Sequence, residues 1–349
     1  MKKLYQIFAF ALVLIMAVML TGLVGCYNAQ ETAAPTQASA TPEPTPVQST
    51  STPEPTPEPV PINIAALKGP TGMGMSFLMQ ASENGKTQNT YDFTLSGAPD
   101  DVVSKFISGE VDVAAVPINL AAVLMAKTDN VKILAVNTLG VLYILENGDT
   151  IHSVADLAGK TIEATGQAAT PEYILSYILQ KNGIADSVTV EYLTEHSELA
   201  ALMASGDVTL GMLPEPNVTV VMSKNPDVRV ALNLTDEWEA VTGTQLVQGC
   251  IIARADFAEE NHDALQVFLD EYAQSVENVN TDHAAAAELI AKYGIVESAA
   301  VAEKAIDNCN IVCMTGDEMK ESADAMFAVL FEANPKSIGG AIPDESIYF

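Results

Sequence analysis

The chain of 349 residues carries 45 acidic and 16 basic side chains, giving a formal net charge of −29, and 48 % of its residues are hydrophobic. Nucleic-acid binding needs clustered lysine and arginine, so this composition argues against a nucleic-acid partner. Arg229 and Arg254 are the only arginines, which makes a site of several guanidinium groups hard to assemble. Four cysteines in a chain of this length do not indicate a disulfide framework.

Residues 1–25 have the organisation of a secretory signal. Lys2 and Lys3 precede an apolar run at 7–20, which is shorter than the roughly 20 residues of a membrane span. The following Leu23-Val24-Gly25-Cys26 resembles the lipobox of bacterial lipoproteins. That resemblance implies cleavage before Cys26 and its lipidation, and an uncleaved N-terminal anchor is the alternative. Either way, we expect an extracytoplasmic protein held at the cell membrane.

Residues 26–61 are expected to form a spacer after the lipidated cysteine. Nine of the 18 prolines lie here, in repeated Thr-Pro-Glu-Pro units with almost no apolar side chains. Such a composition cannot form a core, and proline favours extended conformations. We therefore predict a semi-rigid tether that lifts the following domain off a lipid surface.

The remaining residues, 62–349, are predicted to be a globular α/β unit that begins with a strand at 62–67. A glycine loop, 69–74, leads into a helix that opens near Met75. Apolar alternation then predicts strands at 91–95, 111–116 and 131–136, and helical spacing predicts helices at 100–108 and 120–127.

The same order of elements recurs further along the chain. We predict strands at 161–164, 188–193, 208–213 and 228–232, with helices at 172–181, 197–205 and 216–223. Pro171 is well placed at the first turn of a helix. The loop between the first of these strands and its helix, residues 165–171, corresponds to the glycine loop of the first copy.

The two copies align without a gap in their central part. Ser108-Gly109-Glu110-Val111 matches Ser205-Gly206-Asp207-Val208, and Pro117 matches Pro214, so the offset is 97 residues. Strands that alternate with helices predict parallel sheets covered by helices on both faces. The repeat therefore predicts two such sheets related by pseudo-symmetry.

These features resemble a family of bacterial extracytoplasmic solute-binding proteins, in the ABC-importer branch for nitrate, sulfonates, taurine and thiamine precursors. The resemblance covers about residues 62–349. Its carriers are Gly69-Pro70-Thr71-Gly72-Met73-Gly74, residues 106–114, Ser153-Val154-Ala155-Asp156-Leu157-Ala158-Gly159-Lys160-Thr161, Gly206-Asp207-Val208 and residues 238–243. The Asp-Leu-x-Gly-Lys stretch is common to many periplasmic binding proteins and does not specify a ligand.

The resemblance implies a two-lobed, type II periplasmic-binding-protein fold. Each lobe would be a mostly parallel sheet flanked by helices, with the ligand cleft between the lobes. Lobe 1 would comprise 62–140 and 253–349, and lobe 2 would comprise 141–252. Apolar, strand-like segments near 140–145 and 246–253 would form the hinge crossings.

Loops at the carboxyl ends of parallel strands face the crevice of such sheets, so they supply the candidate ligand-binding residues. Free backbone N–H groups before a helix suit an anion or polar group, and a plain turn is the alternative reading. The candidates from these loops are Thr71, Gly72, Met73 and Gly74 in the first copy, and Thr165, Gly166, Gln167, Ala168 and Thr170 in the second.

Four further candidates follow other strands or carry ring systems. Asn119 and Thr138 could hydrogen-bond a ligand in the first lobe. Glu215 would suit an amine or a ring N–H donor, although it could equally be a solvated loop acid. Trp238, the single tryptophan, could stack on a planar ligand or simply fill a core.

No local motif indicates catalysis, a cofactor or a metal. Walker loops, His-Glu-x-x-His, Gly-x-Ser-x-Gly and EF-hand patterns are all missing from the sequence, and the four histidines are scattered. Met73, Met75 and Met79 raise the idea of a copper site, but a helix core explains them better. Cys250 is expected to be a small buried hydrophobe, and a Cys309–Cys313 bridge would be strained.

We therefore expect a monomeric, lipid-anchored receptor that closes on a small solute and delivers it to the permease of an ABC importer. Scarce arginine favours a neutral or heteroaromatic solute, with a sulfonate- or nitrate-like solute as the other class. An enzyme of thiamine-pyrimidine synthesis on the same fold, and a ligand-sensing module of a signalling receptor, are the alternatives left open.

Overall fold

The computed structural model describes residues 59–167 and 169–349. The expected signal, Cys26, most of the tether and Ala168 lie outside the described residues. The described residues group into one compact unit. Within the described residues, no helix combines the length and the apolar character needed to cross a membrane.

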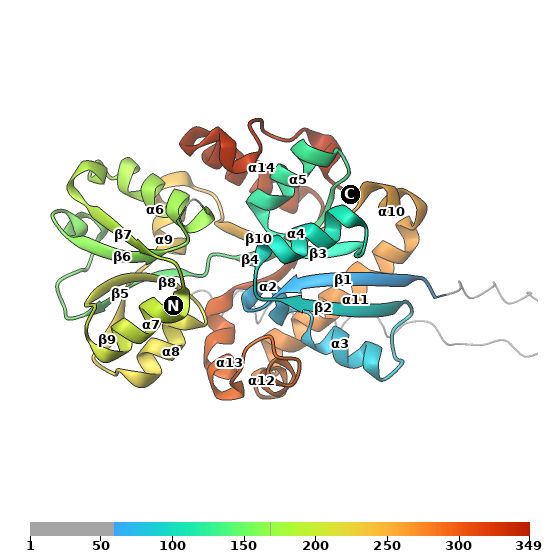
Figure 1. The fold of residues 1–349 in the computed structure, drawn as a ribbon, viewed down its shortest axis with the longest axis horizontal. Coiled ribbons are helices and arrows are strands. Elements are labelled where there is room, and N and C mark those ends of the chain that lie inside the picture. The colour runs from blue at the N-terminus through green and yellow to red at the C-terminus, as the bar shows by residue number, and fades with distance from the viewer. Residues whose placement is uncertain (1–58, 168) are drawn as a thin grey trace, which may run out of the picture. The chain divides into compact units, whose positions relative to one another are not determined.

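A six-stranded sheet forms the centre of the first lobe (Figure 1). Its strands are β1 (Pro61–Leu67), β2 (Thr90–Ser96), β3 (Val113–Pro117), β4 (Lys132–Leu139), β10 (Val247–Ala253) and β11 (Ile311–Met314). The order across the sheet is β11-β4-β10-β3-β1-β2. β1 pairs in parallel with β2 and β3, whereas β10 runs antiparallel between β3 and β4.

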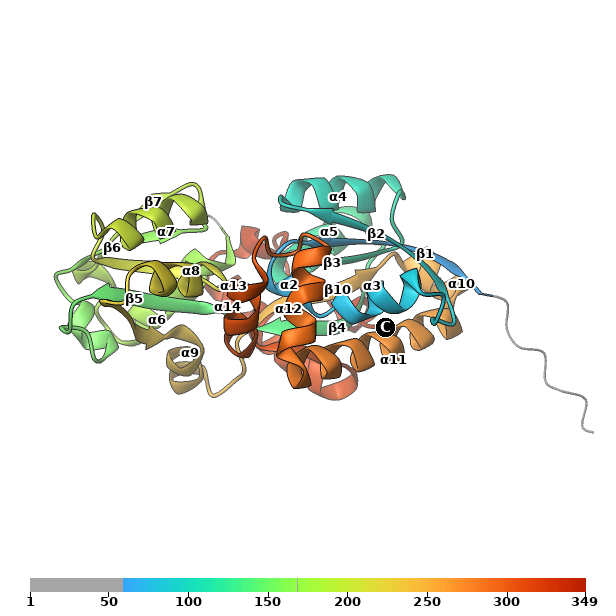
Figure 2. The same ribbon diagram turned by 90° about the horizontal axis from the view of Figure 1, so that it is seen from below.

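Helices cover both faces of this sheet, as Figures 1 and 2 show. Their bounds are α2 (Pro70–Met73), α3 (Ser76–Glu83), α4 (Pro99–Ser108), α5 (Ile118–Thr128), α10 (Ala255–Glu260), α11 (His262–Thr281), α12 (His283–Lys292), α13 (Ala299–Ala305) and α14 (Gly316–Ala333). Alternate residues of β1 enter different cores: Ile64 packs in the cluster with Phe268 of α11, and Ala65 in the cluster with Phe106 of α4. Burial on both faces explains why these strands are apolar throughout.

A five-stranded sheet forms the second lobe. Its strands are β5 (Leu142–Asn147), β6 (Thr161–Thr165), β7 (Thr189–Leu193), β8 (Leu210–Pro214) and β9 (Val228–Asn233), in the order β7-β6-β8-β5-β9. Its helices are α6 (Thr170–Lys181), α7 (His196–Ser205), α8 (Asn217–Lys224) and α9 (Leu234–Thr242). One face packs on α7 and α8, through Leu199 and Val221, and the other on α6 and α9, through Ile174 and Trp238.

The two sheets repeat the same topology. The order β2-β1-β3-β10-β4 corresponds position by position to β7-β6-β8-β5-β9, including one antiparallel strand in the fourth place. The helices before β3 and β8 end alike, on Gly109 and Gly206 with φ of 75° and 85°. The structure therefore shows the predicted two-lobed α/β fold. The sheets are mixed, because β10 and β11 in the first and β5 in the second run antiparallel to their neighbours.

The chain crosses between the sheets twice. After β4 it passes through Gly140 and Val141 into β5, and after α9 it returns through residues 243–246 into β10. A Cβ on Gly140 would lie 2.0 Å from the Thr235 hydroxyl oxygen, so only glycine fits the first crossing without a shift. The residues after β10 add β11 and most of the helices of the first lobe.

Candidate functional site

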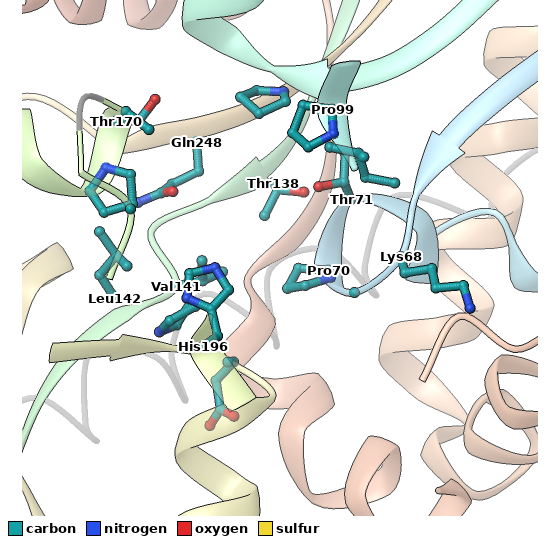
Figure 3. Close-up of a pocket in the computed structure, with 18 of the residues that line it drawn as sticks. Lys68, Pro70, Thr71, Pro99, Thr138, Val141, Leu142, Thr170, His196 and Gln248 are labelled. Carbon is teal, nitrogen blue, oxygen red and sulfur yellow. The ribbon is translucent and has the colours of Figure 1, made fainter. Parts of the chain in front are cut away.

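A cavity of about 460 Å³ lies where strand ends and helix starts of both lobes meet. In Figure 3, Leu142 and Thr170 of the second lobe stand on one side of it, and Lys68 and Thr71 of the first lobe on the other. Prolines contribute much of the lining, at positions 70, 99, 117, 171, 214 and 216. Proline rings are rigid and apolar, so they shape the cavity without supplying hydrogen-bond donors.

Four helices begin at this cavity without a capping side chain. Their first turns supply the lining residues Pro99 of α4, Asn119 of α5, Thr170 of α6 and His196 of α7. Within the described chain, the N-cap residues of these helices make no side-chain hydrogen bond. Elsewhere among the described residues, some helices have a capping side chain, namely Asn233 at α9, Asp282 at α12 and Ser298 at α13, whereas α3, α10, α11 and α14 do not. What distinguishes the four starts at the cavity is that they meet at one place. First-turn N–H groups need acceptors and carry the positive end of the helix dipole, so these four favour an acceptor-rich or anionic group.

A buried hydrogen bond joins the two lobes at the cavity wall. The Thr170 hydroxyl donates to Asn119 Oδ1 at 2.9 Å, and both side chains are buried. Asn119 Nδ2 in turn donates to the Ser337 carbonyl at 3.4 Å. Both predicted residues therefore line the cavity and join the first turns of α5 and α6.

His196 lines the cavity and leans on a predicted residue behind it. Its Nδ1 lies 2.6 Å from the Thr165 hydroxyl, which is buried. Partial desolvation at the cavity wall lowers the pKa of His196, whose side chain is still partly exposed, and the neighbouring Glu195 opposes this by raising it. The imidazole is therefore favoured in its neutral form, with its other nitrogen available to a ligand.

Glu215 lines the cavity but is already engaged by the protein. Its carboxylate accepts hydrogen bonds from the Thr219 backbone N–H at 3.1 Å, the Thr219 hydroxyl at 3.0 Å and Asn308 Nδ2 at 3.4 Å. Burial raises the pKa of Glu215, and these hydrogen bonds lower it in opposition. Glu215 thus caps the first turn of α8 and ties it to the first lobe.

Cations at the cavity are few. Lys68 and His196 are the basic residues among the described residues that line it. Arg229 instead pairs with Glu146 at 2.7 Å, and Arg254 pairs with Asp112 at 3.4 Å, both outside the cavity lining. Neither arginine is placed to hold a ligand there.

The structure brings some of the predicted site residues to the cavity and leaves others away from it. Six line it: Thr71, Asn119, Thr138, Gly166, Thr170 and Glu215. Thr165 lies behind His196, Gln167 is exposed outside the lining, and Ala168 lies outside the described residues.

The remaining predicted residues lie outside the cavity lining. Residues 70–73 form the short helix α2 rather than an open loop, and the N–H groups of Gly72 and Met73 donate to the Gly69 carbonyl at 3.0 and 3.1 Å. The expected free N–H groups are therefore absent at these two positions. A Cβ on Gly74 would lie 2.6 Å from the Tyr272 hydroxyl, so this glycine permits a close approach inside the lobe.

Trp238 lies in the core of the second lobe and does not line the cavity. It is fully buried, and its ring stands 5.5 Å from that of Tyr177 of α6. Its place in the core agrees with the alternative reading, in which the ring packs inside the lobe. The two helices α6 and α9 that it joins cover one face of the second sheet.

The sequence did not predict His196 or Gln248 as lining residues, nor that proline rings would form much of the cavity wall. A lone histidine at a helix start and a glutamine on a strand belong to no motif, so only their place in the fold reveals them. The three described cysteines are free, with Cys250 and Cys309 buried. In the described part of the chain, no group of three or more His, Cys, Asp or Glu is placed to hold a metal ion.

Comparisons with known proteins agree with this geometry. The family model for "ABC transporter, phosphonate, periplasmic substrate-binding protein" matches residues 84–303, more than half of the chain. None of the curated proteins matches the sequence.

Solved structures share the fold. An ABC transporter protein from Parabacteroides distasonis matches with a TM-score of 0.70 and 20 % identity, covering 82 % of this chain and 98 % of its own. The aliphatic sulphonate-binding protein SsuA of Escherichia coli gives 0.66 and 19 %, covering 81 % and 91 %. The alkanesulfonate-binding SsuA of Xanthomonas axonopodis pv. citri, bound to MOPS, gives 0.60 and 16 %, covering 82 % and 96 %.

Proposed function

Because this chain belongs to the phosphonate periplasmic substrate-binding family of ABC transporters, and is the solute-binding component of an importer, we propose that its cavity captures a small solute with an oxoanion head group. The two lobes would close on the solute about the crossings and present it to the permease. With the lobes divided as expected from the sequence, at 140–145 and 246–253, the cavity lies beside both crossings. Val141 and Gln248, one from each crossing, line it.

The observation that carries the proposal is the group of four uncapped helix starts at one cavity. The first turns of α4, α5, α6 and α7 offer N–H groups that their own N-cap side chains leave unbonded. An oxoanion has several acceptor atoms on one centre, so it can satisfy donors that converge from different helices. A neutral head group with one or two acceptors would leave more of them unpaired.

The apolar lining indicates what kind of group is attached to the head group of the solute. Leu120, Val141 and Leu142 join the proline rings around the cavity. A short organic body attached to the head group would fit such surroundings, as in an alkyl phosphonate or sulfonate. The sulfonate-like class left open by the sequence is therefore our first candidate, ahead of the neutral or heteroaromatic class.

Transport requires binding and release rather than turnover. The family consists of substrate-binding proteins, and its members work outside the cytoplasm. We propose that Cys26 carries the lipid anchor, that residues 27–61 act as a tether, and that a single copy serves the permease. Changing Cys26 to Ser should move the protein from the membrane fraction to the soluble fraction, and unchanged fractionation would contradict the anchor.

A ligand panel tests the proposed solute class. Methylphosphonate, ethanesulfonate and nitrate are compared with a thiamine pyrimidine and riboflavin by calorimetry and thermal shift. A ligand present at about 100 times its Kd raises the free energy of unfolding by about 2.7 kcal/mol. A stabilisation of this size is readily measured as a rise in Tm. We expect the phosphonate or sulfonate to give that rise. A rise with the heteroaromatic compounds alone would overturn the oxoanion assignment and favour the second class.

A further inference from the structure

Gln248 occupies an irregular place on the strand that returns from the second lobe. On the β4 side of β10, Val247 pairs with Leu139 and Gly249 pairs with Thr138, so Gln248 stands between two pairs without a partner of its own. This is a β-bulge, which bends a strand locally and redirects a side chain. Gln248 lines the cavity together with Thr170 (Figure 3).

The side-chain amide of Gln248 is a buried donor with nothing to bond. Among the described residues, its Nε2 is out of contact with solvent and lacks a hydrogen-bond partner. Two buried polar side chains of the cavity wall are by contrast engaged within the protein, Asn119 with Thr170 and Glu215 with Thr219. Buried polar groups in folded proteins are almost always satisfied, so an orphan donor in a binding cavity indicates a group reserved for a ligand.

The backbone around Gln248 is held rigidly. A Cβ on the next residue, Gly249, would lie 2.7 Å from Asn137 Oδ1, so β10 approaches β4 more closely than another residue would allow. Asn137 Nδ2 donates to the Thr71 carbonyl at 3.0 Å, which fixes the opposite wall of the cavity to the same point. The backbone at the bulge is therefore positioned by its close packing on β4.

We infer that Gln248 determines the solute specificity of this protein: its Nε2 donates a hydrogen bond to an acceptor atom of the captured solute. The inference rests on the proposed function, since it places this donor in the proposed solute cavity. Because Gln248 lies at the start of β10, directly after the returning crossing, the bond also ties the solute to the strand about which the lobes would close. An acceptor is therefore required on the side of the solute that faces β10.

The test uses Gln248→Met, which keeps the length of the side chain and removes the donor. In the full chain without solute, we expect the Tm to stay the same or to rise, because an unpaired buried amide is replaced by an apolar group. The Kd for methylphosphonate or ethanesulfonate should rise about tenfold, the effect of one lost hydrogen bond. Gln245→Met is the matched control: this glutamine lies on the same returning segment, exposed and outside the cavity lining, and should change neither quantity.

Two results would overturn the inference. One is a clear fall in the Tm of Gln248→Met without solute, which would show that the amide has a structural partner. The other is an unchanged Kd for a probe that the wild type binds. If the wild type binds neither probe, the proposed oxoanion function fails, and the Tm comparison still decides whether the amide is reserved or structural.

Discussion

The two lobes are copies of one unit up to the end of β3 and β8, and they differ in the residues that follow. Gly109 and Gly206 donate equivalent bonds to the carbonyls of Phe106 and Met203, which are 97 residues apart like the glycines themselves. The strands then end on Pro117 and Pro214, both of which line the cavity. The two copies therefore keep the same residues where a helix ends and where a strand ends.

The difference begins one residue later, at the cavity. The first lobe continues with Ile118-Asn119 and places an amide at the start of α5. The second continues with Glu215-Pro216, and the carboxylate caps α8. One copy thus leaves its helix start without a capping side chain, whereas the other satisfies it internally. The comparison teaches that a duplicated fold acquires an asymmetric cavity through the few residues after each strand.

The largest effect should come from the two arginines, of which each lobe has one. Arg229 Nη2 donates to Glu146 at 2.7 Å and to the Ile151 carbonyl at 2.7 Å, and Glu146 is buried. Arg229→Met should lower the free energy of unfolding by about 3 kcal/mol, because it leaves a buried carboxylate without its cation, although the hydrogen bonds from Thr150 and Ile151 remain. Arg254 is 3.4 Å from Asp112, which also accepts from the side chain and backbone of Asn63, so Arg254→Met should cost about 1–2 kcal/mol.

Urea titration of both variants measures this difference between the lobes. Neither substitution should change the Kd for a solute by more than about twofold, since both arginines lie outside the cavity lining. Arg229→Lys is the control. It retains the positive charge next to Glu146 but lacks the guanidinium geometry that bonds Glu146 and the Ile151 carbonyl together. A large loss of affinity in either methionine variant would contradict the assignment of the arginines to structure.

The sequence predicted the repeating frame well and the cavity only in part, for physical reasons. Apolar alternation and turn glycines are local signals, so the strands and helices of both copies could be read from them. Residues after strands, such as Asn119 and Thr170, followed from topology. Gln248 could not be predicted, because a bulge depends on the register between β10 and β4, which local pattern does not encode. Trp238 could not be assigned either, since an aromatic ring fits a core and a stacking site equally.

The glycines at the ends of α4 and α7 test whether the two copies are equivalent at these positions, with a smaller expected loss of stability than the arginine variants. Both have positive φ, 75° at Gly109 and 85° at Gly206. Alanine at either position should cost about 1–2 kcal/mol, because a Cβ disfavours this left-handed conformation. A Cβ at Gly109 also meets Arg254 Nη1 at 2.9 Å, whereas one at Gly206 has only an ordinary contact with Asn147, so Gly109→Ala should be slightly the worse.

Thermal unfolding of the two alanine variants checks this. Gly97→Ala is the control for stability, since Gly97 is not among the positive-φ glycines and a Cβ there meets no atom within 4 Å. Equal, small losses at Gly97, Gly109 and Gly206 would contradict a conformational role for the two helix-ending glycines.

The smallest effect concerns Glu215, the carboxylate that the second copy has and the first copy lacks. Burial raises the pKa of Glu215 above its ordinary 4.5, while the bonds from Thr219 and Asn308 oppose it. A carboxyl whose pKa is higher in the folded state binds more protons there than in the unfolded chain. Its contribution to stability is therefore full below the unfolded pKa and declines as the pH rises through the folded pKa.

Comparing wild type with Glu215→Gln across pH 4–8 isolates this contribution, because the other titrating groups are shared. The stability of wild type relative to the variant should fall as the pH rises above about 4.5 and then level off. Thr219→Val removes a hydroxyl that lowers the pKa of Glu215 and should move the decline to higher pH. A relative stability that rises with pH would mean that the hydrogen bonds outweigh burial. Glu215 would then be a strongly held anion, and the second copy would oppose an oxoanion at the cavity more than the first.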